Sequence, residues 1–180
     1  VAGTSPVTIT SANVGSDVLF TVTKANGALA LGANVFTVVS TDAAGNQGTS
    51  NITITRNEYV AYNGTVGLGP VVSTNDLQVI AYDKNGNILD KANVSATGTY
   101  TLNIDKSYTS ALTLRVANKT ASTANADYRD ESTGANKDIG TSSIAAVVVA
   151  DGTSQTVHIT AVTDLVARQL SINNVISASN

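Results

Sequence analysis

The sequence contains no cysteine, methionine or tryptophan, and only one histidine. Disulfides are therefore excluded, and a zinc site would need more His or Cys ligands than the chain has. The absence of a starting methionine indicates a mature protein or an excised segment. No secretory leader is visible, and no apolar run reaches the roughly 18 residues that would span a membrane, so we expect no membrane insertion.

Charged residues are also scarce, at 13% of the chain, and aromatic residues amount to 4%. A net charge of −3 leaves no basic patch to displace counterions from a phosphate backbone, which argues against nucleic acid as a partner. A hydrolase triad needs a nucleophile beside a base, and no G-x-S-x-G turn surrounds a serine. We therefore expect a protein that is not an enzyme.

The residues that are abundant favour β-structure. The chain has 25 Thr, 17 Ser and 18 Asn, and Val and Ile add 33 more residues. Branching at Cβ suits Thr, Val and Ile to a pleated surface, and a core built from small apolar residues suits two thin packed sheets. Alternating runs predict strands at residues 6–12, 17–23, 34–41, 51–56, 77–82 and 111–117. Hairpin turns are expected at residues 42–46 and 83–87.

One short helix is expected near the C-terminus, over residues 163–170. Leu165, Val166 and Leu170 share a face there, and either Thr163 or Asp164 could cap the helix. Just before it, the lone histidine, His158, lies in an alternating run that favours an outward-facing position on a sheet.

The first part of the chain resembles a known family. The run LALGANVFTVVSTDAAGNQGTSNITITR looks like the C-terminal half of the bacterial Ig-like repeats of giant surface adhesins. This resemblance covers residues 1–57 and implies a partial Ig-like domain whose first strands are absent. Either the chain was cut within a repeat, or another segment supplies those strands, because an open sheet edge is a template for pairing.

The second part, residues 58–180, has a different character. It carries NGTVGLGPVV, LQVIAYDKNGNILDKANVSATGTYTLNI, YRDESTG and finally VHITAVTDLVARQL. These segments resemble the transthyretin-like, or carboxypeptidase-regulatory-like, β-sandwich. Together the two resemblances imply an all-β chain of tandem Ig-like and transthyretin-like β-sandwiches with one short C-terminal helix. That fold hosts many roles and does not by itself identify a function.

Calcium is the metal that the oxygen-rich loops favour, because it binds carboxylate, amide and carbonyl oxygens. Three loops gather such groups, namely Asp42 with Asn46; Asp83, Asn85, Asn87 and Asp90; and Asp127, Asp130 and Glu131. Ordinary turn chemistry is the alternative for the first two loops. The third concentrates three carboxylates without an evident turn role, although Arg129 could neutralise them instead. The resemblance to adhesin repeats, which use calcium to stiffen junctions, supports the calcium prediction.

The six tyrosines are spread along the chain, so no aromatic cluster or pocket for a sugar is evident from the sequence. Tyr59 and Tyr62 fall at the expected domain junction and could pack there.

The function expected from these features is a structural or adhesive module of a bacterial cell-surface or secreted protein, such as the stalk or spacer of a large adhesin. The alternative is a subunit of an extracellular pilus-like filament, assembled by β-strand complementation between neighbours. The expected partners are neighbouring Ig-like domains or identical subunits, bound through open sheet edges. A third reading, a glycan-binding tip, has no pocket to support it. Residues 1–57 are not expected to fold alone, because a half-sandwich buries too little apolar surface.

Overall fold

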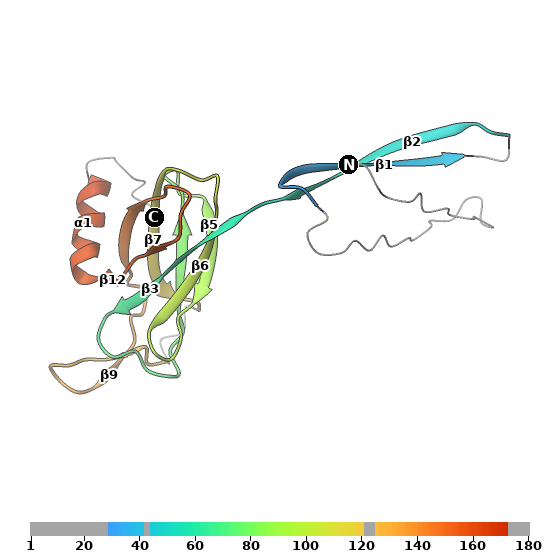
Figure 1. The fold of residues 1–180 in the computed structure, drawn as a ribbon. Coiled ribbons are helices and arrows are strands. Elements are labelled where there is room, and N and C mark those ends of the chain that lie inside the picture. Colours follow the sequence, from blue (N-terminus) through green and yellow to red (C-terminus); the bar gives the residue numbers. More distant parts are fainter. Residues whose placement is uncertain (1–28, 42–43, 121–124, 173–180) are drawn as a thin grey trace. The chain divides into compact units, whose positions relative to one another are not determined.

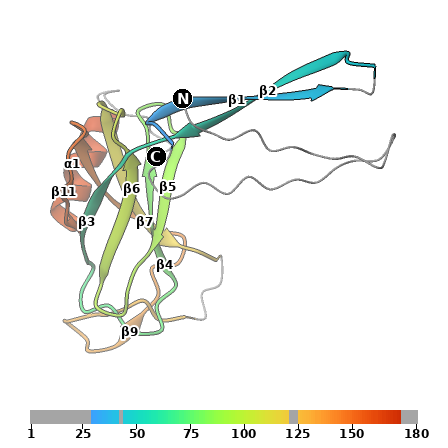
Figure 2. The same cartoon turned by 45° about the vertical axis from the view of Figure 1, so that its right-hand side comes forward.

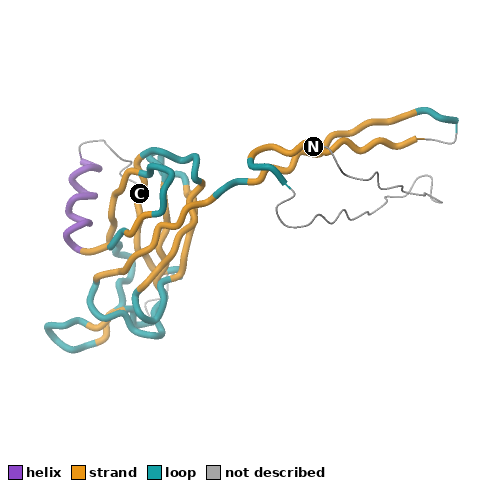
Figure 3. The backbone as a smooth tube through the Cα atoms, in the orientation of Figure 1, coloured by secondary structure: helices purple, strands orange, loops and turns teal. Residues whose placement is uncertain are grey.

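The computed structural model of the chain describes residues 29–41, 44–120 and 125–172. These residues are mostly in strands, with one short helix near the C-terminus (Figure 3). The chain divides into two compact units, one ending at Arg56 and the other beginning at Asn57, and each is described by itself. Among the described residues, no helix is long and apolar enough to cross a membrane.

The elements, labelled in Figure 1, are β1 (Gly32–Thr41), β2 (Gln47–Arg56), β3 (Tyr59–Gly67), β4 (Leu77–Tyr82), β5 (Ile88–Asn93), β6 (Thr99–Asp105), β7 (Ala111–Asn118), β8 (Tyr128–Arg129), β9 (Asn136–Lys137), β10 (Ile144–Val149), β11 (Gln155–Thr156), β12 (Ile159–Thr160) and α1 (Ala161–Ile172).

The described part of the first unit is an antiparallel hairpin of β1 and β2. The register runs without a break from Gly32 opposite Arg56 to Thr41 opposite Gln47. This pairing confirms the two predicted strands as a hairpin, although β2 begins at Gln47, four residues before its predicted start. Residues 42 and 43 of the predicted turn lie outside the described residues. The other strands predicted in this unit, at residues 6–12 and 17–23, lie outside the described residues.

The second unit contains two larger sheets. One has the strand order β10–β7–β4–β5, in which every neighbouring pair is antiparallel. In the other, β3 pairs antiparallel with β6 along one edge and parallel with β11 and then β12 along its other edge. Helix α1 lies against β10 and β12, and Figures 1 and 2 show it beside the strands. A small pair, β8 and β9, forms a hairpin of its own.

The two larger sheets share one apolar core. Alternate side chains of two predicted strands face this core, because Leu77, Val79 and Ala81 of β4 and Leu112, Leu114 and Val116 of β7 are completely buried. The other sheet contributes apolar side chains from β3, β6 and β12 to the same cluster, namely Tyr62, Val66, Tyr100, Leu102, Ile104 and Ile159. Tyr62, considered a junction residue from the sequence, is thus part of this core.

Strand β3 was not expected, because its glycines indicate a loop in a single sequence. Gly64 shows why a glycine stands there. A Cβ atom built on it would lie 1.8 Å from the backbone oxygen of Val157, in the segment that joins β11 to β12. The backbone N–H of Val157 donates to the oxygen of Asn63 over 2.7 Å in the same place. The missing side chain therefore lets the returning chain pass directly against β3.

Helix α1 confirms the predicted helix but begins earlier than expected, and the predicted cap was wrong. Thr160 caps it: its Oγ1 accepts from the backbone N–H of Thr163 over 3.3 Å, and the Oγ1 of Thr163 accepts in return from the N–H of Thr160 over 2.8 Å. This is a reciprocal capping box in which threonine takes the usual place of glutamate. Asp164 instead accepts from the N–H of Ala145 over 3.0 Å, which ties the helix to β10.

Candidate functional site

The hairpin β1–β2 carries an unusual amount of exposed apolar surface. Every residue of β2 is exposed. Ile52 and Ile54 are 49% and 46% exposed, and Val35 and Val39 on β1 are 59% and 53% exposed. Apolar side chains of this size more often lie in a core, so a row of them on the surface of a short hairpin is unusual.

Both faces of the hairpin contribute to this surface. Residues that pair directly across an antiparallel ladder point to the same face. Phe36 is paired with Ile52, whereas Val35 is paired with Thr53 on the opposite face. One face is therefore lined by an aromatic and an aliphatic residue, and the other alternates valine with threonine.

Within the described residues, β1 and β2 pair only with each other, which Figure 2 lets the reader follow. No third described strand therefore pairs with either outer edge of this hairpin. A two-stranded hairpin is marginal in water at best, and unpaired edges recruit further strands. We name the exposed faces and edges of β1 and β2 the open hairpin.

One end of the open hairpin is held by polar contacts. Asn34, buried with 3% of its surface exposed, accepts from the N–H of Ala30 over 2.9 Å. Its amide nitrogen donates to the oxygens of Ala30 and Gly32. Arg56 donates to the oxygen of Leu29 over 2.7 Å. These bonds fix the bend that leads into β1.

Of the acidic residues predicted to bind calcium, Asp127 is completely buried. Its Oδ1 accepts from the backbone N–H of Asp76 over 3.0 Å, and its Oδ2 accepts from the N–H of Ile139 over 2.9 Å. One carboxylate therefore fastens two distant segments, the approach to β4 and the segment after β9. The sequence did not predict this structural role of Asp127, because its hydrogen-bond donors are backbone groups far away in the chain.

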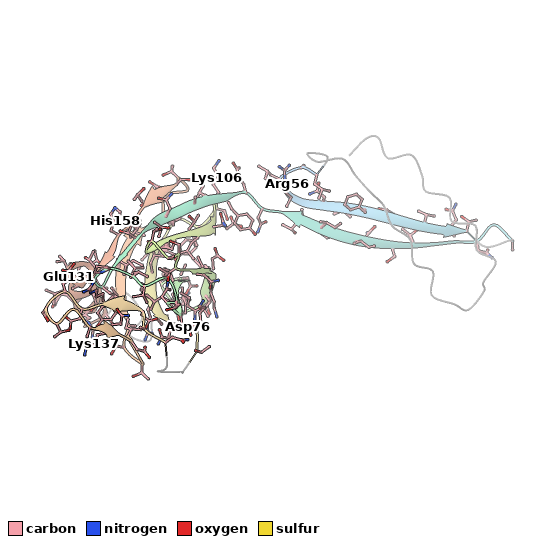
Figure 4. The ribbon with its side chains drawn as sticks, turned by 90° about the horizontal axis from the view of Figure 1, so that it is seen from below. Arg56, Asp76, Lys106, Glu131, Lys137 and His158 are labelled. Atoms are coloured by element: carbon pink, nitrogen blue, oxygen red, sulfur yellow. The ribbon has the colours of Figure 1, made fainter. Side chains whose placement is uncertain are left out.

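Asp130 has the turn role that the sequence did not reveal. Its Oδ1 accepts from Ser132 N–H over 2.8 Å, from Ser132 Oγ over 2.7 Å and from Thr133 N–H over 3.2 Å. These hydrogen bonds, that of the Ser132 hydroxyl first, lower the pKa of Asp130. Arg129 donates to the backbone oxygen of Gly134 over 3.0 Å, and Glu131, labelled in Figure 4, is exposed.

The predicted calcium ligands are thus not gathered around one centre. Nowhere in the described ranges do three His, Asp or Glu side chains come together closely enough to hold a metal ion. Asp42 lies outside the described residues, and Asn46 is exposed in the loop before β2. Calcium binding stays a prediction.

The loop of Asp83, Asn85, Asn87 and Asp90 shows the turn chemistry given as its alternative. Asp83 Oδ1 accepts from the N–H groups of Asn85 and Asn87, each over 2.8 Å, and closes the turn between β4 and β5. Gly86 adopts a φ of 89°, the left-handed conformation that such turns require. Asp90 instead accepts from the N–H of Asn103 over 2.7 Å and so links β5 to β6.

Asp138 is a second carboxylate whose structural role the sequence did not predict, and it holds two loops of the second unit together. Asp138 Oδ1 accepts from Gly140 N–H over 2.5 Å and from Asn118 Nδ2 over 2.8 Å. These bonds, the backbone one first, lower the pKa of Asp138. Asp76, labelled in Figure 4, accepts from the Thr120 hydroxyl, which is the main cause of its lowered pKa.

His158 is exposed, as predicted, while its neighbour Ile159 is completely buried. Its Nδ1 lies 2.8 Å from the hydroxyl of Thr65 and accepts from the N–H of the same residue over 3.3 Å. The ring therefore bridges β3 and the segment beside it, and its contacts are those of a surface residue on a sheet.

Comparisons with protein-family models, with curated proteins and with solved structures gave no match.

Proposed function

We propose that this chain is a structural or adhesive module of a bacterial cell-surface or secreted protein, a stalk or spacer of a large adhesin, and that it does no catalysis. In this proposal the second unit is a transthyretin-like β-sandwich, and the first is the C-terminal half of an Ig-like domain. The open hairpin carries the proposal. Its exposed valines and isoleucines are explained if further strands pack over them and bury them.

Two sources of the covering strands define the two forms of this proposal. In the stalk, strands of the same polypeptide cover the hairpin, and the alternating runs at residues 6–12 and 17–23 are suited to that role. In the alternative, the strand comes from an identical neighbouring subunit, and the chain polymerises by strand complementation. Among the described strands, β1 and β2 pair only with each other, which favours strand addition in either form.

The decisive measurement is hydrogen exchange of the whole chain, followed in peptides from residues 32–41 and 47–56. A covered hairpin exchanges slowly there, because a third strand binds the outer amides. Exchange as fast as in the unfolded chain, at every protein concentration, would overturn the proposal. The molar mass by light scattering then separates the two forms: a monomer is expected for the stalk, and a ladder of oligomers for the filament.

A matched pair of variants sharpens this experiment. Ile52→Lys places a charge on the face that Ile52 shares with Phe36, and should make both peptides exchange faster. Val149→Lys changes an even more exposed apolar residue on β10, in the second unit, and should leave the hairpin unchanged. Equal effects of the two substitutions on the hairpin would show that its exposed residues are not covered.

A further inference from the structure

A hollow of about 440 Å³ opens on the surface of the second unit, and none of the open hairpin's residues line it. It lies where the start of β3, the strand β5 and the turn between β6 and β7 come together. We name it the tyrosine hollow after Tyr59 and Tyr108, which are far apart in the sequence and both line it. The volume is in the range of small-ligand sites.

The apolar part of the tyrosine hollow is lined by two aromatic and two aliphatic side chains. Tyr59 is 58% exposed, an unusually open position for an aromatic ring. Tyr108 is half-buried, and its hydroxyl donates to the oxygen of Ala111 over 2.5 Å, which fixes the ring. Buried Ile104 supplies the floor, and Leu89, 38% exposed, supplies the wall.

Of the polar groups in the hollow, Asp105 is held in place by the turn that follows β6. The backbone N–H of Tyr108 donates to the oxygen of Asp105 over 2.9 Å and closes the turn. Asp105 Oδ1 accepts from the N–H and hydroxyl of Ser107 over 2.9 and 2.7 Å. Its second carboxylate oxygen, like the amide of Asn57, has no hydrogen-bond partner among the described residues. A hydrogen-bond acceptor and an amide therefore flank the two rings, and the carboxylate held by Ser107 has little conformational freedom to lose on binding.

The charges around the hollow exclude an anionic ligand. No lysine or arginine lines it, and Asp105 contributes a negative charge. The adjacent Lys106, labelled in Figure 4, is paired with Glu58, with Nζ and Oε1 3.0 Å apart. The N–H of Lys106 also donates to the oxygen of Glu58 over 2.8 Å, which ties the turn to the start of β3.

We propose that the tyrosine hollow binds a neutral saccharide, with one sugar face on Tyr59 and hydroxyl groups donating to Asp105. A pyranose ring has an apolar face of C–H groups, which suits a tyrosine ring, and a rim of hydroxyls, which suits a carboxylate and an amide. This inference is independent of the proposed function and adds a recognition site to a structural module.

The test is saturation-transfer NMR on the whole chain, with the methyl glycosides of glucose, galactose, mannose and N-acetylglucosamine as probes. At least one is expected to receive saturation, and Tyr59→Ala should weaken its binding about tenfold because the stacking face is lost. Tyr59→Phe keeps that face and should bind within about twofold of the unchanged chain. Val149→Ala removes an exposed apolar side chain elsewhere and should have no effect.

Asp105→Asn distinguishes a specific hydrogen bond between the sugar and the Asp105 carboxylate from nonspecific stacking on the exposed Tyr59 ring. The amide oxygen can still accept from Ser107, so the turn should persist, whereas the bond to the sugar loses its charge and should weaken several-fold. Absence of transfer to all four glycosides would overturn the proposal, and so would equal transfer in the chain and in Tyr59→Ala. Binding of tetramethylammonium without any sugar would also overturn it, since the hollow would then be a cation site.

Discussion

At the scale of single residues, the second unit depends on a few side chains with distant partners and on one glycine, which leaves room for a neighbouring backbone. Gly64 admits the backbone of Val157, and Asp127 fastens the segments around Asp76 and Ile139. Each position has an unambiguous physical consequence when it is changed. Neither consequence can be read from the neighbours in sequence, because the contacts span most of the unit.

Gly64→Ala should destabilise the second unit by roughly 2–4 kcal/mol, because its Cβ would overlap a backbone oxygen that can move only with the whole segment. Gly67→Ala on the same strand is the matched control. Its Cβ would meet a methyl group of Thr160 at 3.1 Å, so the capping Thr160 side chain need give way by only a few tenths of an ångström, and the loss should be smaller. Urea unfolding of the two variants measures the difference. Equal stabilities would mean that β3 does not run against Val157.

Asp127→Ala should lower the free energy of unfolding by roughly 2–5 kcal/mol, since two backbone amides lose their acceptor in a buried place. Asp130→Ala, which removes an exposed turn contact, should have a much smaller effect. The same unfolding curves recorded with added calcium test the calcium prediction: a higher midpoint in the unchanged chain, lost in both variants, would support it. An Asp127→Ala variant as stable as Asp130→Ala would contradict this structural role of Asp127.

At the scale of elements, strand and helix ends are set by different kinds of contact. The strand Leu77–Tyr82 has the predicted bounds because alternation and an Asx turn coincide at its end. Helix α1 begins two residues before the predicted start, because Thr160 belongs both to β12 and to the cap. Thr160 can both end β12 and begin α1 because its hydroxyl reaches the backbone N–H of Thr163.

Thr160→Val should destabilise α1 by about 1 kcal/mol, because valine keeps the branched shape but cannot accept from Thr163 N–H. Thr160→Ser retains the hydroxyl and serves as the control, with a loss of only a few tenths of that amount. Circular dichroism and urea unfolding report the helix and the unit together. If valine and serine are equally stable at this position, the capping box contributes nothing.

At the scale of the whole molecule, stability against acid depends on carboxylates that share one property. Hydrogen bonds to neighbouring hydroxyl, amide or backbone N–H groups lower the pKa values of Asp76, Asp83, Asp105, Asp130, Asp138 and Asp151 below 3.8. A group whose pKa is lower in the folded state stabilises the fold above its unfolded pKa. That contribution is lost as the pH falls through the folded value.

We therefore expect the free energy of unfolding to be level above about pH 5 and to fall steadily below about pH 4. Asp138→Asn should make this fall shallower, because its amide oxygen can still accept from Gly140 but no longer takes up a proton. Val149→Ala, which changes an exposed residue that does not titrate, is the control and should leave the acid slope as it is in the unchanged chain. Stability that rises toward pH 3 would contradict the lowered pKa values.

The sequence by itself determined the local features: the β-rich composition, the alternation that buries Leu77, Val79 and Leu112, the turn at Asp83 and the presence of a C-terminal helix. These follow from residues close together in the chain, where side-chain period and turn chemistry act directly. Tertiary structure alone decided which distant segments meet. It made a strand of the glycine-rich β3, gave Asp127 its backbone partners, moved the cap to Thr160 and brought Tyr59 beside the turn of Asp105 and Tyr108. The physical reason is that such contacts depend on strand order and close backbone approach, and neither leaves a periodic signal in the sequence.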